Sequence, residues 1–159
     1  MYIIKRISKN SIVAVLIIAF MLLLLVLRLT AVSGSTTAYC EAVGKYSTVI
    51  DSELSVEEFL KQFDIEIDKS TKQAVNIIIP SEFNQVYESY NALQQSQGLD
   101  LNDYKGKKAT RYTYNVTNST GNSDLICNII VCENKVIAGD LCTTALNGAM
   151  TALTDNTLK

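Results

Sequence analysis

The stretch TRYTYNVTNSTGNSDLICNIIVCENKVIAGDLC, residues 110–142, decides the fold because three strand patterns follow one another in it. Residues 110–117 alternate strictly, which is typical of a strand with one buried face. Residues 125–132 are almost wholly apolar, as expected of a central strand covered on both faces. The pair Glu133-Asn134 predicts a tight turn into a third strand, residues 135–142. The stretch therefore predicts an antiparallel meander.

Two amphipathic helices precede this meander. Ser55 and Glu58 match a capping box, with Leu54 and Phe59 at the positions of a hydrophobic staple, so a first helix is expected to begin at Ser55. A second helix is predicted for residues 82–97. Its start is assigned to Ser81 and its end to Gly98. It carries an apolar stripe of Phe83, Val86, Tyr87, Tyr90 and Leu93.

Two shorter strand patterns, residues 64–68 and 74–79, lie between the helices and are separated by the polar residues 69–73. The order is therefore helix, strand, strand, helix and a three-stranded meander. This order predicts an α+β domain of two layers, with two helices packed on one side of an antiparallel sheet.

The N-terminal residues carry the pattern of a membrane segment. Lys5, Arg6 and Lys9 precede sixteen consecutive apolar residues, 12–27, and Arg28 follows them. A bilayer core of about 30 Å needs roughly 20 apolar residues in a helix. We therefore predict a transmembrane signal-anchor at residues 11–32. The basic flank, residues 1–10, is expected in the cytoplasm and the remainder outside.

Two alternatives to a retained anchor remain open. A cleavable secretory signal would use residues 31–33 as its cleavage site, although the apolar run is long for one. A lipoprotein would carry its lipid on Cys40, where the bulky Tyr39 precedes the cysteine and disfavours this alternative. In all three cases the domain leaves the cytoplasm. After the membrane segment we predict a linker at residues 33–50, a domain at 51–153 and a tail at 154–159.

The charge distribution disfavours nucleic acid as a partner. Ten basic and 16 acidic residues follow the membrane segment, which leaves the outer part with a formal charge of −6. Binding to nucleic acid requires a basic surface.

The composition also excludes several kinds of catalytic site and metal site. The chain has no histidine, which excludes Ser-His-Asp and Cys-His catalysis and every metal site that needs a histidine ligand. Asp64, Glu66 and Asp68 have the spacing that begins a calcium loop, but Lys69 and Val75 stand at two later positions that the loop requires to be Gly and acidic. We therefore predict no catalytic residue, no metal and no cofactor.

The four cysteines are Cys40, Cys127, Cys132 and Cys142. A turn at 133–134 would place residue 127 opposite residue 140, so Cys127 and Cys142 become diagonal neighbours on one face. They are the candidates for a disulfide, although diagonal neighbours lie about 7–8 Å apart, which is slightly long for a bridge. The alternative is that buried thiols act as small apolar side chains.

The candidate interaction surface lies on the meander and consists of Arg111, Tyr112, Tyr114 and Asp140. An aspartate beside Gly139 within a strand is unusual, because strands are depleted in both residue types. The alternative is a cross-strand pair of Arg111 and Asp140 that only fixes the register.

The residues on the second helix and beyond resemble an uncharacterised family of membrane-anchored extracytoplasmic domains from Gram-positive, mostly clostridial, bacteria. It is known as domain of unknown function forty-eight thirty. The matching residues are Phe83, Val86-Tyr87, Tyr90-Asn91, Leu93-Gln94, Gln97-Gly98, Asp100-Leu101, Tyr104-Lys105-Gly106-Lys107, Arg111-Tyr112-Thr113-Tyr114, Gly139-Asp140 and Cys142.

Two departures concern local geometry. Where the family tends to have Gly-Trp this chain has Asp64-Ile65, and where it has a glycine at the hairpin this chain has Glu133-Asn134. The resemblance implies an anchored outer domain and no established activity.

Together these observations predict a single-pass membrane protein whose extracytoplasmic domain binds a protein, a peptide or a component of the cell envelope. The alternatives are a secreted domain after signal cleavage, an accessory to a partner membrane protein, and a carboxylate-dependent hydrolase that works without histidine.

Overall fold

The computed structural model describes residues 13, 15–24, 36–119, 125–144 and 148–155. The chain divides into two compact units, residues 1–35 and residues 36–159. In the first unit, residues 15–24 are helical and expose their large apolar side chains. The predicted flank and half of the predicted anchor lie outside the described residues. Among the helices that are described, none has both the length and the apolar character to cross a membrane.

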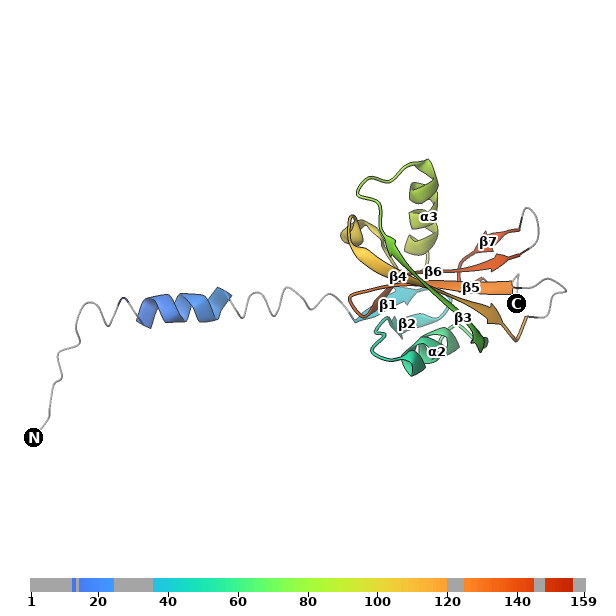
Figure 1. Cartoon of the computed structure of the whole chain (residues 1–159), viewed down its shortest axis with the longest axis horizontal. Coiled ribbons are helices and arrows are strands. Elements are labelled where there is room, and N and C mark those ends of the chain that lie inside the picture. Colours follow the sequence, from blue (N-terminus) through green and yellow to red (C-terminus); the bar gives the residue numbers. More distant parts are fainter. Residues whose placement is uncertain (1–12, 14, 25–35, 120–124, 145–147, 156–159) are drawn as a thin grey trace, which may run out of the picture. The chain divides into compact units, whose positions relative to one another are not determined.

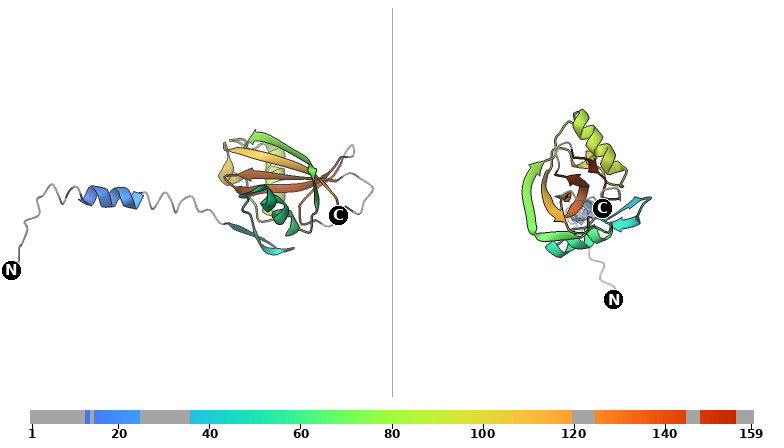
Figure 2. Two further views of the ribbon diagram at one scale, coloured as in Figure 1. Left: turned by 60° about the horizontal axis from the view of Figure 1, so that its bottom comes forward. Right: turned by 90° about the vertical axis from the view of Figure 1, so that its right-hand side faces the viewer.

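The second unit is built on an antiparallel sheet whose described strands follow one another in sequence order (Figure 1). The strands are β3 (Ile67–Ile78), β4 (Lys108–Val116), β5 (Leu125–Cys132), β6 (Lys135–Thr143) and β7 (Met150–Thr151). The predicted meander of β4, β5 and β6 is confirmed. The sheet is strongly curved (Figure 2).

The strand β3 corrects the prediction of two strands with a loop between them. It is one strand, and the polar residues 69–72 form an irregularity in its pairing with β4 between Asp68 and Gln73. The carboxylate of Asp68 accepts hydrogen bonds from the main-chain N–H and the hydroxyl of Ser70. These local bonds replace strand-to-strand hydrogen bonds at the irregularity. Pairing with β4 can therefore resume at Gln73, and the strand continues.

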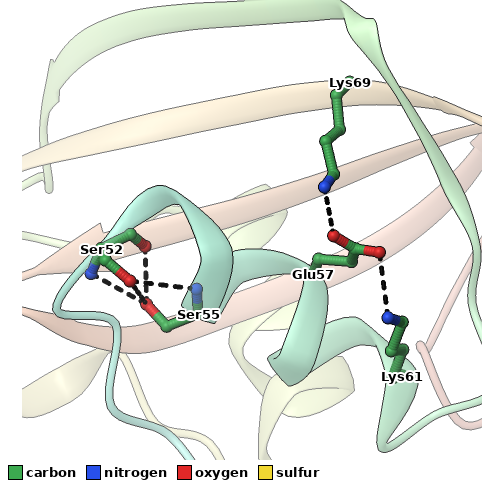
Figure 3. Close-up of polar contacts among 5 residues, drawn as sticks. All are labelled: Ser52, Ser55, Glu57, Lys61 and Lys69. Atoms are coloured by element: carbon green, nitrogen blue, oxygen red, sulfur yellow. Dashed lines mark hydrogen bonds and ion pairs between the residues drawn. The ribbon is translucent and has the colours of Figure 1, made fainter.

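The helices α2 (Glu53–Lys61) and α3 (Gln85–Gln95) both begin at different residues from those predicted. The N-cap of α2 is Ser52, whose hydroxyl accepts from the N–H of Ser55, while the Ser55 hydroxyl accepts from the N–H of Ser52 (Figure 3). The predicted box of Ser55 and Glu58 is therefore wrong, because serine fills both roles. The N-cap of α3 is Asn84 rather than Ser81.

An ion-pair cluster on the surface ties α2 to the sheet. Glu57 of α2 contacts Lys61 one turn later in the helix, at 3.0 Å, and also Lys69 of β3 (Figure 3). These contacts lower the pKa of Glu57, but the lysines are largely exposed and solvent weakens the pairs.

The two helices cover opposite faces of the sheet (Figures 1 and 2). The helix α2 lies on one face together with a hairpin of β1 (Thr37–Cys40) and β2 (Gly44–Ser47), and α3 lies on the other. The α+β class is confirmed, whereas the two-layer arrangement is wrong. Most of the predicted linker is also part of the folded unit, because Tyr46 of β2 is buried against Phe59 and Phe63 of α2.

Two apolar cores result, one on each face. The core under α2 consists of Cys40, Tyr46, Ile50, Val56, Phe59, Leu60, Phe63, Ile65, Leu99, Tyr114, Leu125, Cys127, Ile129, Val136, Leu141 and Leu153. The smaller core on the α3 side consists of Ile79, Leu101, Ala109, Ile130, Cys132, Ile137 and Ala138. The strands β5 and β6 contribute to both, as expected of strands that are buried on two faces.

The outer edge of β6, on the side away from β5, has three different partners along its length. Near its start, Val136 donates to the carbonyl of Thr48, and Val49 forms a bridge with Lys135. Near its end, β7 pairs with Leu141 and Cys142. Between these two pairings, at Gly139, side chains take the place of a strand.

Those side chains are Gln94 and Gln97, at the end of α3, and both are fully buried. The N–H of Gly139 donates to Oε1 of Gln94 at 2.8 Å, and Nε2 of Gln97 donates to the carbonyl of Gly139 at 2.9 Å. The Oε1 atom of Gln97 also accepts from the N–H of Leu153 at 2.6 Å. We call this set the glutamine bridge. It joins α3, β6 and the C-terminal segment.

Gly98 follows directly and allows the chain to leave α3 close to β1. Its φ is +82°, and a Cβ atom at this position would overlap the main-chain carbonyl of Tyr39. The helix was predicted to extend to residue 97, but α3 ends at Gln95 with Ser96 as its C-cap, and Gly98 takes the left-handed backbone in the turn that follows.

We expect Gly98→Ala to destabilise the protein by more than the roughly 1–2 kcal/mol that a left-handed backbone costs an alanine. The added Cβ would collide with main-chain atoms of Tyr39, which cannot move without displacing β1. Gly106→Ala is the matched control, because Gly106 has a φ of +75° and open space around it. Urea denaturation gives the free energy of unfolding of each variant. Equal losses for the two variants would contradict the contact with β1.

We also expect Gln97→Met to lower the free energy of unfolding by about 2–4 kcal/mol, because it leaves two buried main-chain groups without partners. The control is Gln95→Met in the same helix, which loses an exposed hydrogen bond to Asp100 and should cost about 1 kcal/mol or less. If the two variants were equally stable in urea, the glutamine bridge would have no special role.

Candidate functional site

A cleft of about 840 Å³ lies between α3 and the face of the sheet that α3 covers. Its walls come from β3, β4, β5 and β6, from Met150 of β7 and from one side of α3. They are mainly apolar, and the apolar side chains are Ile77, Ile79, Val86, Leu93, Leu101, Ile130 and Met150.

Most of the predicted apolar stripe of α3 lines this cleft, and two of its members, Phe83 and Tyr90, pack against the core on the α3 side. Val86, Tyr87, Tyr90 and Leu93 all line the cleft, and Val86 is 74% exposed. The residues of α3 that are buried in its span are polar, Asn91 and Gln94. An amphipathic helix normally buries its apolar side, so this arrangement leaves apolar surface open to a ligand.

Asn91 fixes the connection after α3 and was not predicted as important. Its Oδ1 accepts from the N–H of Leu101 at 2.8 Å, and its Nδ2 donates to Asp100 at 3.0 Å. This anchors Leu101, which is fully buried, beneath the cleft. The signal in the sequence was a set of amides at positions 91, 94 and 97, spaced three apart before a glycine.

The polar part of the cleft is centred on Asp140, which is only 2% exposed. Its Oδ1 accepts from the hydroxyl of Tyr90 at 2.9 Å. Its Oδ2 accepts from Nδ2 of Asn128 at 2.9 Å and from the thiol of Cys142 at 3.0 Å. Asn128 is itself held by the hydroxyl of Thr113, which donates to its Oδ1 at 2.7 Å. We call these five residues the Asp140 cluster.

The cluster keeps its weak acids protonated. Burial, and then the charge and hydrogen bond of Asp140, raise the pKa of the Tyr90 hydroxyl far above its usual value. Burial also raises the pKa of the Cys142 thiol to about 12, with a further contribution from its hydrogen bond to Asp140. At neutral pH both groups therefore act as donors, and the thiol is a poor nucleophile.

The predicted interaction surface is divided between the two faces of the sheet. Arg111 and Asp140 both line the cleft. Tyr114 is buried in the core under α2, and Tyr112 packs against that core. Whether Arg111 and Asp140 belong to an interaction surface stays a prediction.

The alternative of a cross-strand pair between Arg111 and Asp140 is wrong. Arg111 pairs with Ile130 in the ladder of β4 and β5, while Asp140 pairs with Asn128 in the ladder of β5 and β6. A whole strand lies between them, and no ion pair joins them in the described part of the chain.

The possible disulfide of Cys127 and Cys142 is not formed, because the two residues lie on opposite faces of the sheet, and the alternative of unbridged thiols holds for this pair. The turn at Glu133-Asn134 is as predicted. Beyond it, the pairing shifts by one residue at Ile137, so residue 127 lies opposite 141 instead of 140. A shift of one residue moves every later side chain of a strand to the other face.

The cleft offers one carboxylate. Among its lining residues within the described ranges, Asp140 is the only acidic side chain and Arg111 the only basic one. Two carboxylates would be needed for a general acid and base of the glycosidase type. The arrangement can instead supply apolar contact, a fixed negative charge and neutral hydrogen-bond donors.

Comparison with known proteins yields one match. A family model described as a domain of unknown function (DUF4830) matches residues 59–141, slightly more than half of the chain. The matched segment includes α3 and the whole Asp140 cluster apart from Cys142. No curated protein and no solved structure matches the chain.

We expect Cys142 to react with iodoacetamide only in strongly alkaline solution, because the thiolate is the reacting form and the pKa is about 12. Asp140→Asn removes the charge that favours the protonated thiol, so the reaction should begin at lower pH, although burial keeps the pKa above its ordinary 9.0. Mass spectrometry of alkylated peptides across a pH series measures the rate at this cysteine.

The control for this experiment is Glu133→Gln, a carboxylate in the exposed turn that should leave the rate at Cys142 unchanged. Folding raises the pKa of the Cys142 thiol. The contribution of this thiol to the stability of the protein is therefore present below pH 9 and is lost as the pH rises from 9 towards 12. Identical pH profiles for the wild type and Asp140→Asn would show that the carboxylate does not control the thiol.

Proposed function

The chain belongs to the DUF4830 family, and we propose that its folded unit is an extracytoplasmic binding domain that takes a ligand with an apolar body in the cleft beside α3. The observation that carries this proposal is the orientation of α3. Its apolar stripe lines the cleft, and its buried residues are polar.

The size and lining of the cleft support the proposal. Ligand sites commonly have volumes of about 300–1,000 Å³ and combine apolar walls with a few placed polar groups. This cleft has about 840 Å³, and its polar groups are held in place by hydrogen bonds rather than left mobile. Exposed apolar side chains such as Val86 and Met150 stand at its rim, where a ligand would cover them.

We further propose that a transmembrane helix at residues 11–32 holds this domain at the outer face of a bacterial membrane, with the N-terminus in the cytoplasm. The support is the uninterrupted apolar run, the three basic residues before it and the acidic character of everything after it. A protein, or another component of the envelope, would be the natural source of the ligand. Release of the domain by signal cleavage is the alternative.

To test the cleft, we propose benzyl alcohol as a small neutral probe and the full chain in lipid nanodiscs. The readout is the set of isoleucine methyl resonances. The probe should shift the methyl resonances of Ile77, Ile79 and Ile130, which line the cleft. It should leave the resonances of Ile65 and Ile129, in the core under α2, unchanged.

The variant Ser89→Trp should weaken this binding at least tenfold, a change of about 1.4 kcal/mol, because position 89 lines the cleft and the indole ring would fill it. Ala92→Trp is the control, since Ala92 is an exposed small residue of the same helix that does not line the cleft. Methyl shifts that are absent in the wild type, or equal in the two variants, would contradict the proposed site.

For the anchor, Leu22→Asp should weaken membrane insertion by about 2.5–3.5 kcal/mol, because a charge near the centre of a membrane helix costs that much. Leu22→Ile is the control and should insert normally. Fractionation of cells shows the amount in the membrane, and protease added to intact cells should remove the domain but leave an N-terminal stub. Release of the domain into the medium, beginning near Gly34, would indicate cleavage instead.

A further inference from the structure

We infer that the ligand of the cleft carries a positively charged organic group, an ammonium on an apolar body, which binds at Asp140. This inference rests on the proposed function, because it names the ligand class of the same cleft.

The charge at the polar end of the cleft has no opposite charge beside it in the described part of the chain. Asp140 is 2% exposed, and buried charges in proteins are normally paired with an opposite charge or a metal. Within the part of the chain that the structure describes, no basic side chain forms an ion pair with Asp140. A cation supplied from outside would complete the site.

Three hydrogen-bond donors surround the carboxylate of Asp140. Tyr90, Asn128 and Cys142 are neutral, so they orient Asp140 and offset part of its desolvation without cancelling its charge. A carboxylate has about four acceptor positions, and these donors occupy three. One position therefore remains for the ligand, on a carboxylate that lines the cleft.

Aromatic side chains form the wall of the cleft next to this carboxylate. The rings of Tyr87 and Tyr90 line the cleft on the α3 side. The faces of aromatic rings attract ammonium groups, and proteins use aromatic side chains to bind them. The apolar residues of the other walls, such as Ile130 and Met150, are suited to the body of the ligand.

Arg111 does not oppose this arrangement, because it lies two strands away from Asp140. Adjacent strands are about 4.8 Å apart, so the backbones of β4 and β6 are separated by about 10 Å. Arg111 is also exposed to solvent, where water screens its charge. Its position instead disfavours a ligand with a second positive charge.

The experiment compares three probes of the same shape and different charge: benzylammonium, benzyl alcohol and benzoate. Each is titrated into the full chain in nanodiscs, and the methyl resonances of Ile79, Ile130 and Met150 report occupation of the cleft. We expect benzylammonium to bind at least tenfold more tightly than benzyl alcohol, and benzoate to bind most weakly.

The variant Asp140→Asn keeps the shape of the side chain and removes its charge, so it should bind benzylammonium and benzyl alcohol equally. Asp103→Asn is the control, because Asp103 is an exposed carboxylate that does not line the cleft, and it should keep the preference for benzylammonium. The comparison of probes on the wild-type protein does not depend on either variant, so it remains decisive if Asp140→Asn is unstable.

Equal binding of the three probes, or a preference for benzoate, would overturn the inference and leave the proposed binding function intact. A preference for benzylammonium that persists in a folded Asp140→Asn variant would also overturn it. If none of the three probes shifted the cleft resonances, both this inference and the proposed function would be wrong.

Discussion

None of the described strands lies beside Gly139 on the outer side of β6, and two glutamine side chains make the hydrogen bonds there that a strand would make. An amide side chain can both donate and accept, so it is suited to this task. Buried main-chain groups without partners are costly, and these bonds allow the edge of β6 to be enclosed. The position of α3, and hence of the cleft, depends on them.

The glutamine bridge also explains why α3 has its polar residues inward. Asn91 and Gln94 must point to the sheet and to the connection after the helix, which turns Val86, Tyr87 and Tyr90 towards the cleft. Tyr90 then reaches Asp140, the residue next to Gly139 on the opposite face of β6. One helix orientation thus determines both the enclosed edge and the composition of the candidate site.

The sequence patterns predicted β4, β5, β6 and the turn at Glu133-Asn134 well, because alternation and apolar runs depend on burial that is local to each strand. They failed where contacts between residues far apart in the sequence determine the structure. The irregularity at Ile137 shifts the register, and this placed Cys127 and Cys142 on opposite faces. The stripe of α3 was predicted but the cleft beside it was not, because periodicity shows that a helix has two sides and not what covers them. The hairpin of β1 and β2 has small and polar residues that resemble a spacer, and its burial depends on contacts with α2 and Gly98.

The contacts of Gln97 limit how far the domain can be truncated at either end. Its side chain holds Leu153 near the C-terminus, and its carbonyl accepts a bond from Tyr46, which lies before the segment that the family model covers. Both ends of the folded unit are therefore fastened to the same residue. The family segment, residues 59–141, is shorter than the compact unit of residues 36–159, and a shortened domain that keeps both contacts of Gln97 must extend from Tyr46 to Leu153.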